Sequence, residues 1–155
     1  MTSEAAVRTT SLQNLEHESA ELLSALKAFV RTVPDDMIYR VPSDRAGATV
    51  GEIVVKSAAV LEQMFGGLTS NLWDDPFEWT LPETLASGDL IIRYLDEVDV
   101  ARRRAFAFLG DDSALAKIVS VPSDGQISVL ELLERTLLRA ASYHNEAATI
   151  LKNLS

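Results

Sequence analysis

Residues 128–151 read SVLELLERTLLRAASYHNEAATIL, and this stretch decides the fold. Its apolar side chains recur at intervals of three and four residues, the spacing of one face of an α-helix. The resulting stripe consists of Leu130, Leu133, Leu137, Ala141, His144, Ala148 and Leu151. Ser128, followed three residues later by Glu131, matches the capping box that opens a helix. We therefore predict a helix from Ser128 nearly to the end of the chain, with this face buried.

One histidine, His144, interrupts the apolar stripe. An imidazole that faces a helical core needs a hydrogen-bond partner or a metal, because burying it without either is costly. The other histidine of the chain, His17, lies opposite the apolar face of its own segment and should face solvent. For His144 we expect a hydrogen-bonded core histidine, and contact with a ligand is the alternative.

Three further segments have the same helical period, and none of the chain has a convincing strand or hairpin pattern. The helices expected are Leu12–Val33, opened by a capping box of Thr10 and Gln13, then Thr49 to about Leu72, and about Gly88 to Leu109. Four amphipathic helices without strands can bury their stripes only against one another. The sequence thus predicts an all-α protein, a single domain over residues 1–155, built as a four-helix bundle with long connections at 34–48 and 73–87.

The tetrapeptide Val-Pro-Ser-Asp occurs twice, at residues 41–44 and 121–124, shortly before the second and fourth expected helices. It fits a weak internal repeat, and it fits equally well the common use of Pro and Asp between helices.

An apolar cluster of Trp73, Phe77 and Trp79 lies in the second long connection. We expect it to cap one end of the core, and a dimer contact or a ligand lid are the alternatives. Gly66 and Gly67 lie just before it within a helical pattern, which indicates close packing or a kink.

Composition excludes several classes of function. The chain has no cysteine, which removes disulfides, thiolate nucleophiles and cysteine-based zinc sites. Its net charge is −9, with 14 basic and 23 acidic residues, whereas a phosphate backbone is bound by clustered Lys and Arg. The one dense basic run, Arg102–Arg104, points in three directions on a helix and is expected to form a solvated face. Nucleic acid is therefore not an expected partner.

The sequence also bears on location. No apolar run approaches the ~20 residues of a membrane span, and the first residues lack the order of a secretory signal. We expect a cytoplasmic protein without a membrane partner.

The second expected helix opens with ATVGEIV at residues 48–54. This segment, the spacing of four helices in a chain of this size and the histidine-bearing last helix over 137–151 resemble the DinB/YfiT-like family of four-helix-bundle proteins. The resemblance covers nearly the whole chain. It implies an up-down-down-up bundle, frequent homodimers and a divalent metal held by three histidines. Members with known chemistry include thiol-cofactor-dependent transferases and isomerases.

The resemblance also implies where the three metal ligands should lie. The first belongs seven residues after the position of Thr49, where this chain has Lys56. The other two form a His-x-x-x-His pair on the last helix, at the positions of Ala140 and His144. One ligand of three survives, and a protonated ammonium cannot coordinate a metal. We expect no bound metal or cofactor, and we hypothesise that Lys56 replaces the cation and pairs with a buried acid, Glu134.

The predicted function is binding rather than catalysis. The candidate pocket lies between the second and fourth helices and comprises Lys56, Ala140, His144 and Glu134. It would take a small molecule, or the bundle would bind a second copy of itself as a homodimer. The alternative is a metal-dependent thiol transferase or hydrolase in which His144 and carboxylates form an altered ligand set. A third interpretation is a purely structural homodimer whose pocket is vestigial.

Overall fold

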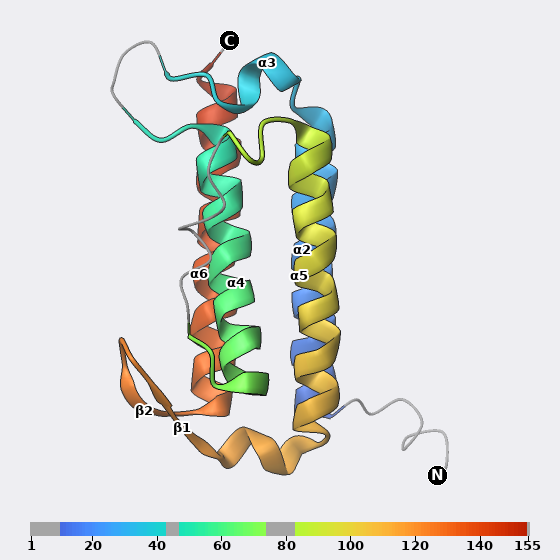
Figure 1. The fold of residues 1–155 in the computed structure, drawn as a ribbon, viewed down its shortest axis with the longest axis vertical. Coiled ribbons are helices and arrows are strands. Elements are labelled where there is room, and N and C mark those ends of the chain that lie inside the picture. Colours follow the sequence, from blue (N-terminus) through green and yellow to red (C-terminus); the bar gives the residue numbers. More distant parts are fainter. Residues whose placement is uncertain (1–9, 43–46, 74–82, 155) are drawn as a thin grey trace.

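The computed structural model describes residues 10–42, 47–73 and 83–154, and these are mostly helical (Figure 1). The four long helices are α2 (Ser11–Thr32), α4 (Val50–Ser70), α5 (Gly88–Leu109) and α6 (Val129–Lys152). The shorter elements are α3 (Asp35–Ile38), the 3-10 helix η2 (Asp112–Ala116), β1 (Ile118–Val121) and β2 (Gly125–Ser128). The predicted all-α class is confirmed, and the predicted helix bounds agree with these to within about two residues.

The long helices lie side by side in two directions. Helices α2 and α6 run one way and α4 and α5 run the other way, with α2 behind α5 and α6 behind α4 in Figure 1. Helix α4 packs against α5 and α6, and α2 packs against the same two helices. Each long helix therefore buries its apolar face against two others.

Each long helix begins at a serine or threonine whose side chain accepts a hydrogen bond from the backbone N–H three residues on. These caps are Thr10, Thr49, Ser87 and Ser128, with oxygen–nitrogen distances of 3.1, 3.2, 3.3 and 3.1 Å. At Thr10 the Gln13 side chain also accepts from the Thr10 N–H, which completes the predicted capping box. At Ser128 the Glu131 carboxylate instead lies 2.7 Å from the Arg135 guanidinium.

The core lies between the four long helices. Its largest fully buried side chains include Leu23, Leu26, Leu61, Phe65, Leu95 and Leu133. Burial of each of these side chains contributes about 1.5–3 kcal/mol to the stability of the fold. Phe65 and Phe106 add an edge-to-face contact between α4 and α5, with ring centroids 6.1 Å apart.

The expectation that the chain has no hairpin is wrong. Strands β1 and β2 pair antiparallel with Val121 opposite Gly125, and the Asp124 N–H donates to the Val121 carbonyl across the turn. Gly125 takes a positive φ of 69°, which glycine adopts without strain. The Val-Pro-Ser-Asp at 121–124 is therefore a hairpin turn, whereas residues 43–44 of the first copy lie outside the described residues.

The first long connection packs over the start of α4. A Cβ on Gly51 would lie 2.6 Å from atoms of both Ile38 and Tyr39, so only glycine fits beneath these side chains. The Tyr39 hydroxyl donates to the Leu85 carbonyl at 2.6 Å, which links this connection to the residues before α5. Burial, together with the negative charge of Glu52, raises the pKa of Tyr39 to about 12.

The other end of α4 is closed by a tryptophan. The indole of Trp73 lies so close to Gly67 that a Cβ there would overlap it. Close packing of another helix, or a kink, was expected at Gly66 and Gly67; Gly67 is closely packed, but against this indole and not against a helix. Of the apolar cluster expected to cap the core, Trp73 is packed against it, while Phe77 and Trp79 lie outside the described residues.

Two aspartates join elements far apart in sequence. The Asp112 carboxylate accepts hydrogen bonds from the N–H groups of Ser11 and Leu12 at 3.2 and 2.9 Å, so η2 caps α2. Asp35 Oδ1 accepts from the Gly88 N–H at 3.0 Å, which ties α3 to the first turn of α5. These carboxylates stabilise helix starts, the role expected of acidic residues there.

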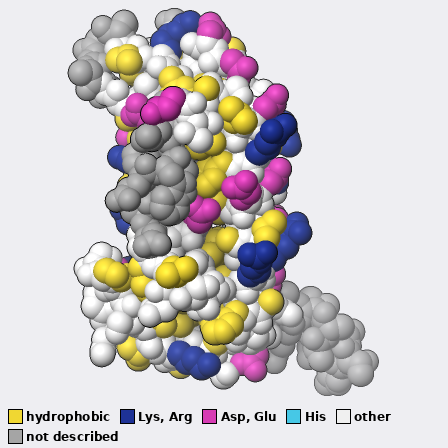
Figure 2. Space-filling view, viewed as in Figure 1, with side chains coloured by type: hydrophobic (Ala, Val, Ile, Leu, Met, Phe, Trp, Pro, Cys, Tyr) yellow, Lys and Arg dark blue, Asp and Glu magenta, His cyan; other side chains and the backbone are white. Residues whose placement is uncertain are grey.

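The surface carries charges of both signs. Along the α5 side of the molecule, Lys and Arg side chains alternate with Asp and Glu (Figure 2). None of the helices described is both long enough and apolar enough to cross a membrane.

Candidate functional site

His144 lies half-buried on α6, on the side that faces α2. The edge of one ring meets the face of the other between His144 and Phe29, with centroids 5.5 Å apart and planes at 77°. Burial lowers the pKa of His144 below its ordinary value of 6.5 and thereby favours the neutral form of its ring. Within the described ranges no hydrogen bond to either ring nitrogen occurs. The expectation of a hydrogen-bonded core histidine is therefore wrong, because the ring reaches solvent and packs on an aromatic neighbour instead.

The buried face of α6 is rotated from the predicted stripe. Its buried residues are Val129, Leu132, Leu133, Leu137, Ala140 and Ala147. The face thus passes through Ala140 and Ala147, whereas Ala141 and Ala148 are half-buried. Leu130, which the stripe included, is 37% exposed. This rotation places His144 towards the α2 edge of the buried face rather than at its centre.

The three positions at which the family resemblance implies metal ligands point different ways. Lys56 on α4 is exposed. Ala140 is fully buried, and its carbonyl accepts a hydrogen bond from the hydroxyl of the fully buried Ser57 at 2.7 Å. This bond brings α4 and α6 into direct contact at Ala140, while His144 turns towards α2. No donor set for a metal converges between α4 and α6 from these residues.

Lys56 and Glu134 do not form the expected internal pair, because both side chains are exposed. Glu134 instead lines a groove between α2 and α6. In the three described ranges, moreover, no group of three or more His, Asp or Glu residues lies close enough to hold a metal ion.

The groove between α2 and α6, called here the α2/α6 groove, has a volume of about 400 Å³. Its lining residues are Glu18, Leu22, Glu134, Leu137, Leu138 and Ala141. Of the neighbouring long helices, α2 and α6 pack least closely, and the groove lies along their contact. Leu138 is 74% exposed at its rim. A mostly apolar concavity of this size is typical of small-molecule sites.

The Phe29–His144 pair lies along the continuation of this groove. Phe29 is two helical turns beyond Leu22 on α2, and His144 is one turn beyond Ala141 on α6. Both helices advance in the same direction, so the pair is reached by following the groove away from Glu18 and Glu134. The imidazole nitrogens of His144 have no hydrogen-bond partner among the described residues, so they are open to a ligand that extends this far.

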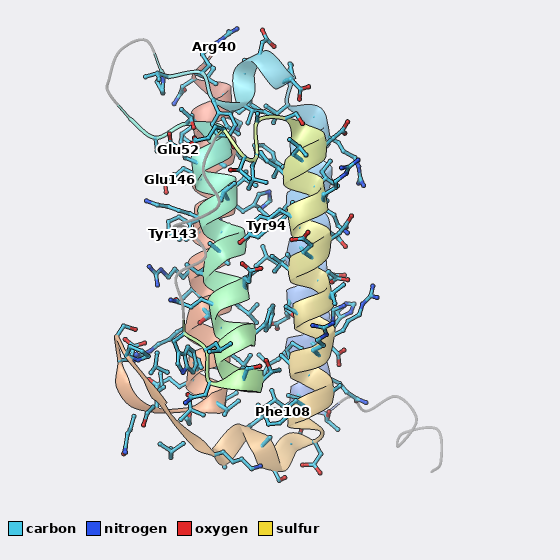
Figure 3. The ribbon with its side chains drawn as sticks, viewed as in Figure 1. Arg40, Glu52, Tyr94, Phe108, Tyr143 and Glu146 are labelled. Carbon is cyan, nitrogen blue, oxygen red and sulfur yellow. The ribbon has the colours of Figure 1, made fainter. Side chains whose placement is uncertain are left out.

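A second cavity, of about 300 Å³, lies between α4 and α5 beside Glu62, Arg93, Tyr94 and Glu97. Tyr94 reaches from α5 towards α4 (Figure 3), and its hydroxyl donates to Glu62 Oε1 at 3.0 Å. Burial raises the pKa of Glu62, the Tyr94 hydrogen bond opposes this, and the charge of Glu97 raises it further. The sequence analysis missed this site, because Glu62 and Tyr94 come from two helices and no local pattern links them.

Of the arginine run on α5, Arg103 and Arg104 are exposed, as expected of a solvated face, but Arg102 is buried. The Arg102 side chain is only 9% exposed, with its Nε 2.8 Å from Asp99 Oδ1 and its Nη1 3.5 Å from Glu16 on α2. Arg103 contacts the same Asp99 carboxylate at 2.9 Å. Burial alone raises the pKa of Asp99, but the hydrogen bond from Arg102 and the nearby positive charges lower it more. Arg102 therefore joins α5 to α2, which sequence spacing could not reveal.

His17 does face solvent as predicted, and its side chain is 74% exposed beside Glu21. Comparison with known proteins adds nothing to these observations: no family model, curated protein or solved structure matches the chain.

Proposed function

We propose that this chain is a DinB/YfiT-like four-helix bundle that binds a small organic molecule in the α2/α6 groove. The directions of α2, α4, α5 and α6 support the up-down-down-up topology of that family. Of the three family ligand positions, Lys56 and Ala140 offer no metal donor and His144 is turned to the groove side. Binding therefore takes the place of metal-dependent transfer.

The observation that carries this proposal is the combination of an apolar groove with an imidazole that has open hydrogen-bonding capacity at its continuation. The apolar part, Leu22, Leu137, Leu138 and Ala141, offers area that a hydrophobic ligand can cover. A neutral His144 has one nitrogen that donates and one that accepts, so it can bind a polar group of the ligand. Few precisely placed polar groups in a mostly apolar concavity are what small-molecule sites commonly combine.

The test uses phenethyl alcohol, a neutral probe with an aromatic ring and one hydroxyl. Its titration into protein with labelled methyl groups should shift the NMR signals of Leu22, Leu137 and Leu138, and the ring signals of His144. Ala141→Phe should abolish these shifts, because a large side chain on the half-buried Ala141 fills the groove.

The matched control is Ala107→Phe, which adds the same side chain at an exposed position of α5. The affinity of this variant for phenethyl alcohol should equal that of the unchanged protein. Shifts that cluster at Glu62 and Tyr94 instead, or an absence of shifts up to the solubility of the probe, would overturn the proposed site.

A further inference from the structure

Two carboxylates stand on opposite sides of the α2/α6 groove. Glu18 comes from α2 and Glu134 from α6, and both line the groove with exposed side chains. Neither has a Lys, Arg or His partner within 4.0 Å in the described part of the chain. Glu16 and Asp112, by contrast, each contact a residue of another element, Arg102 and Leu12 respectively.

The cations nearest along α6 do not neutralise this charge. Arg135 follows Glu134 in sequence, but its guanidinium lies 2.7 Å from Glu131. Arg139 lies over the ring of Tyr143, with its guanidinium carbon 5.9 Å from the ring centroid. The net charge of −9 adds a background that also favours a cation over an anion.

We propose that the α2/α6 groove selects an apolar molecule that carries a protonated amine, with the ammonium between Glu18 and Glu134. This inference rests on the proposed function and names the chemical class of its ligand. The apolar body of the molecule covers Leu22, Leu137 and Leu138, and the ammonium donates hydrogen bonds to the two carboxylates.

A second copy of the chain fits this surface less well than such an amine. In a two-fold symmetric contact the same surface meets itself, so α2/α6 faces would meet α2/α6 faces. Glu18 and Glu134 of one copy would then approach the same carboxylates of the other, and like charges at an interface disfavour association. An amine brings the opposite charge and needs no larger surface than the groove provides.

The test compares three probes that share a phenyl ring on a two-carbon chain. Phenethylamine is a cation at neutral pH, phenethyl alcohol is neutral, and hydrocinnamate is an anion. Dissociation constants measured by NMR titration at low salt should place phenethylamine about three- to tenfold tighter than phenethyl alcohol, the range expected for two exposed ion pairs. Hydrocinnamate should bind more weakly than either.

The variants remove the two carboxylates without changing shape. In Glu18→Gln/Glu134→Gln the ratio of the dissociation constants of phenethyl alcohol and phenethylamine should fall to about one. The matched control, Glu83→Gln/Glu146→Gln, removes two exposed carboxylates that do not line the groove. It should keep the preference, which separates a local effect from the overall negative charge.

The outcomes separate this inference from the proposed function. If the amine and the alcohol bind the groove equally well, the ligand class is wrong and the groove remains a small-molecule site. If no probe binds, the proposed function fails and the inference fails with it. If sedimentation shows a dimer that Leu138→Glu dissociates, a second copy occupies the groove and the inference is overturned.

Discussion

The two contacts that α6 makes with its neighbours differ in how closely they are packed. On the α4 side, Ala140 and Ser57 are both fully buried, and the Ser57 hydroxyl donates a hydrogen bond of 2.7 Å to the Ala140 carbonyl. On the α2 side, Leu138 is 74% exposed and a groove of about 400 Å³ remains. Whether a ligand can bind between two helices therefore depends on how closely their side chains pack. Of the two contacts of α6, only the one with α2 leaves such a groove.

The largest expected effect comes from restoring histidine at the closely packed contact. Ala140→His adds a ring where no solvent reaches, so it should lower the free energy of unfolding by about 1–3 kcal/mol through overpacking. The measurement is urea unfolding at neutral pH. Ala141→His, one residue on at the half-buried groove, is the matched control and should cost clearly less. Equal losses would mean that the two contacts do not differ in packing.

A smaller effect is expected from the hydrogen bond that joins α4 to α6. Ser57→Ala removes the donor to the Ala140 carbonyl and should cost about 1 kcal/mol of unfolding free energy. Ser142→Ala changes an exposed serine on α6 and should stay within about 0.5 kcal/mol of the unchanged protein. If both substitutions prove neutral, the bond does not contribute to the α4–α6 contact.

On the groove side, His144 should make stability depend on pH. Its pKa in the folded chain lies below 6.5, so the unfolded chain binds more protons as the pH falls through 6.5. The free energy of unfolding should therefore decrease with falling pH in this range, and the decrease should be smaller in His144→Gln. Urea unfolding at a series of pH values measures this difference. A slope that is the same in both proteins, or steeper in His144→Gln, would contradict the lowered pKa.

The smallest effect on stability is expected at the rim of the groove. Leu138→Ser replaces a side chain that is already 74% exposed, so the free energy of unfolding should change by less than about 0.5 kcal/mol. The same substitution should weaken the binding of phenethyl alcohol, because it removes apolar surface from the groove. Thermal unfolding and NMR titration of one sample test both. A substantial loss of stability would place Leu138 in the core instead.

The helices and their starts could be predicted because the signals are local. Thr10, Thr49 and Ser128 each precede an apolar period of three and four residues, and each caps its helix. The hairpin was missed because its strands have four residues each, too few to show an alternating pattern. Its turn sequence, moreover, also occurs between helices.

The candidate site could be predicted less well than the helices. Alanine occupies both of the adjacent positions 140 and 141, and again both 147 and 148. The apolar pattern therefore does not decide whether Ala140 and Ala147 or Ala141 and Ala148 face the core. The groove depends on the separation of α2 from α6, and the burial of Arg102 depends on Glu16 in another helix. Such properties arise from contacts between segments far apart in sequence, which residue spacing within one helix does not contain.

The most direct test of the groove as a ligand site is a crystal structure of the protein grown with phenethylamine. The account predicts the phenyl ring against Leu22, Leu137 and Leu138, with the ammonium between Glu18 and Glu134. Phenethylamine bound instead between α4 and α5, or a metal ion held between α4 and α6 beside Ala140, would contradict it.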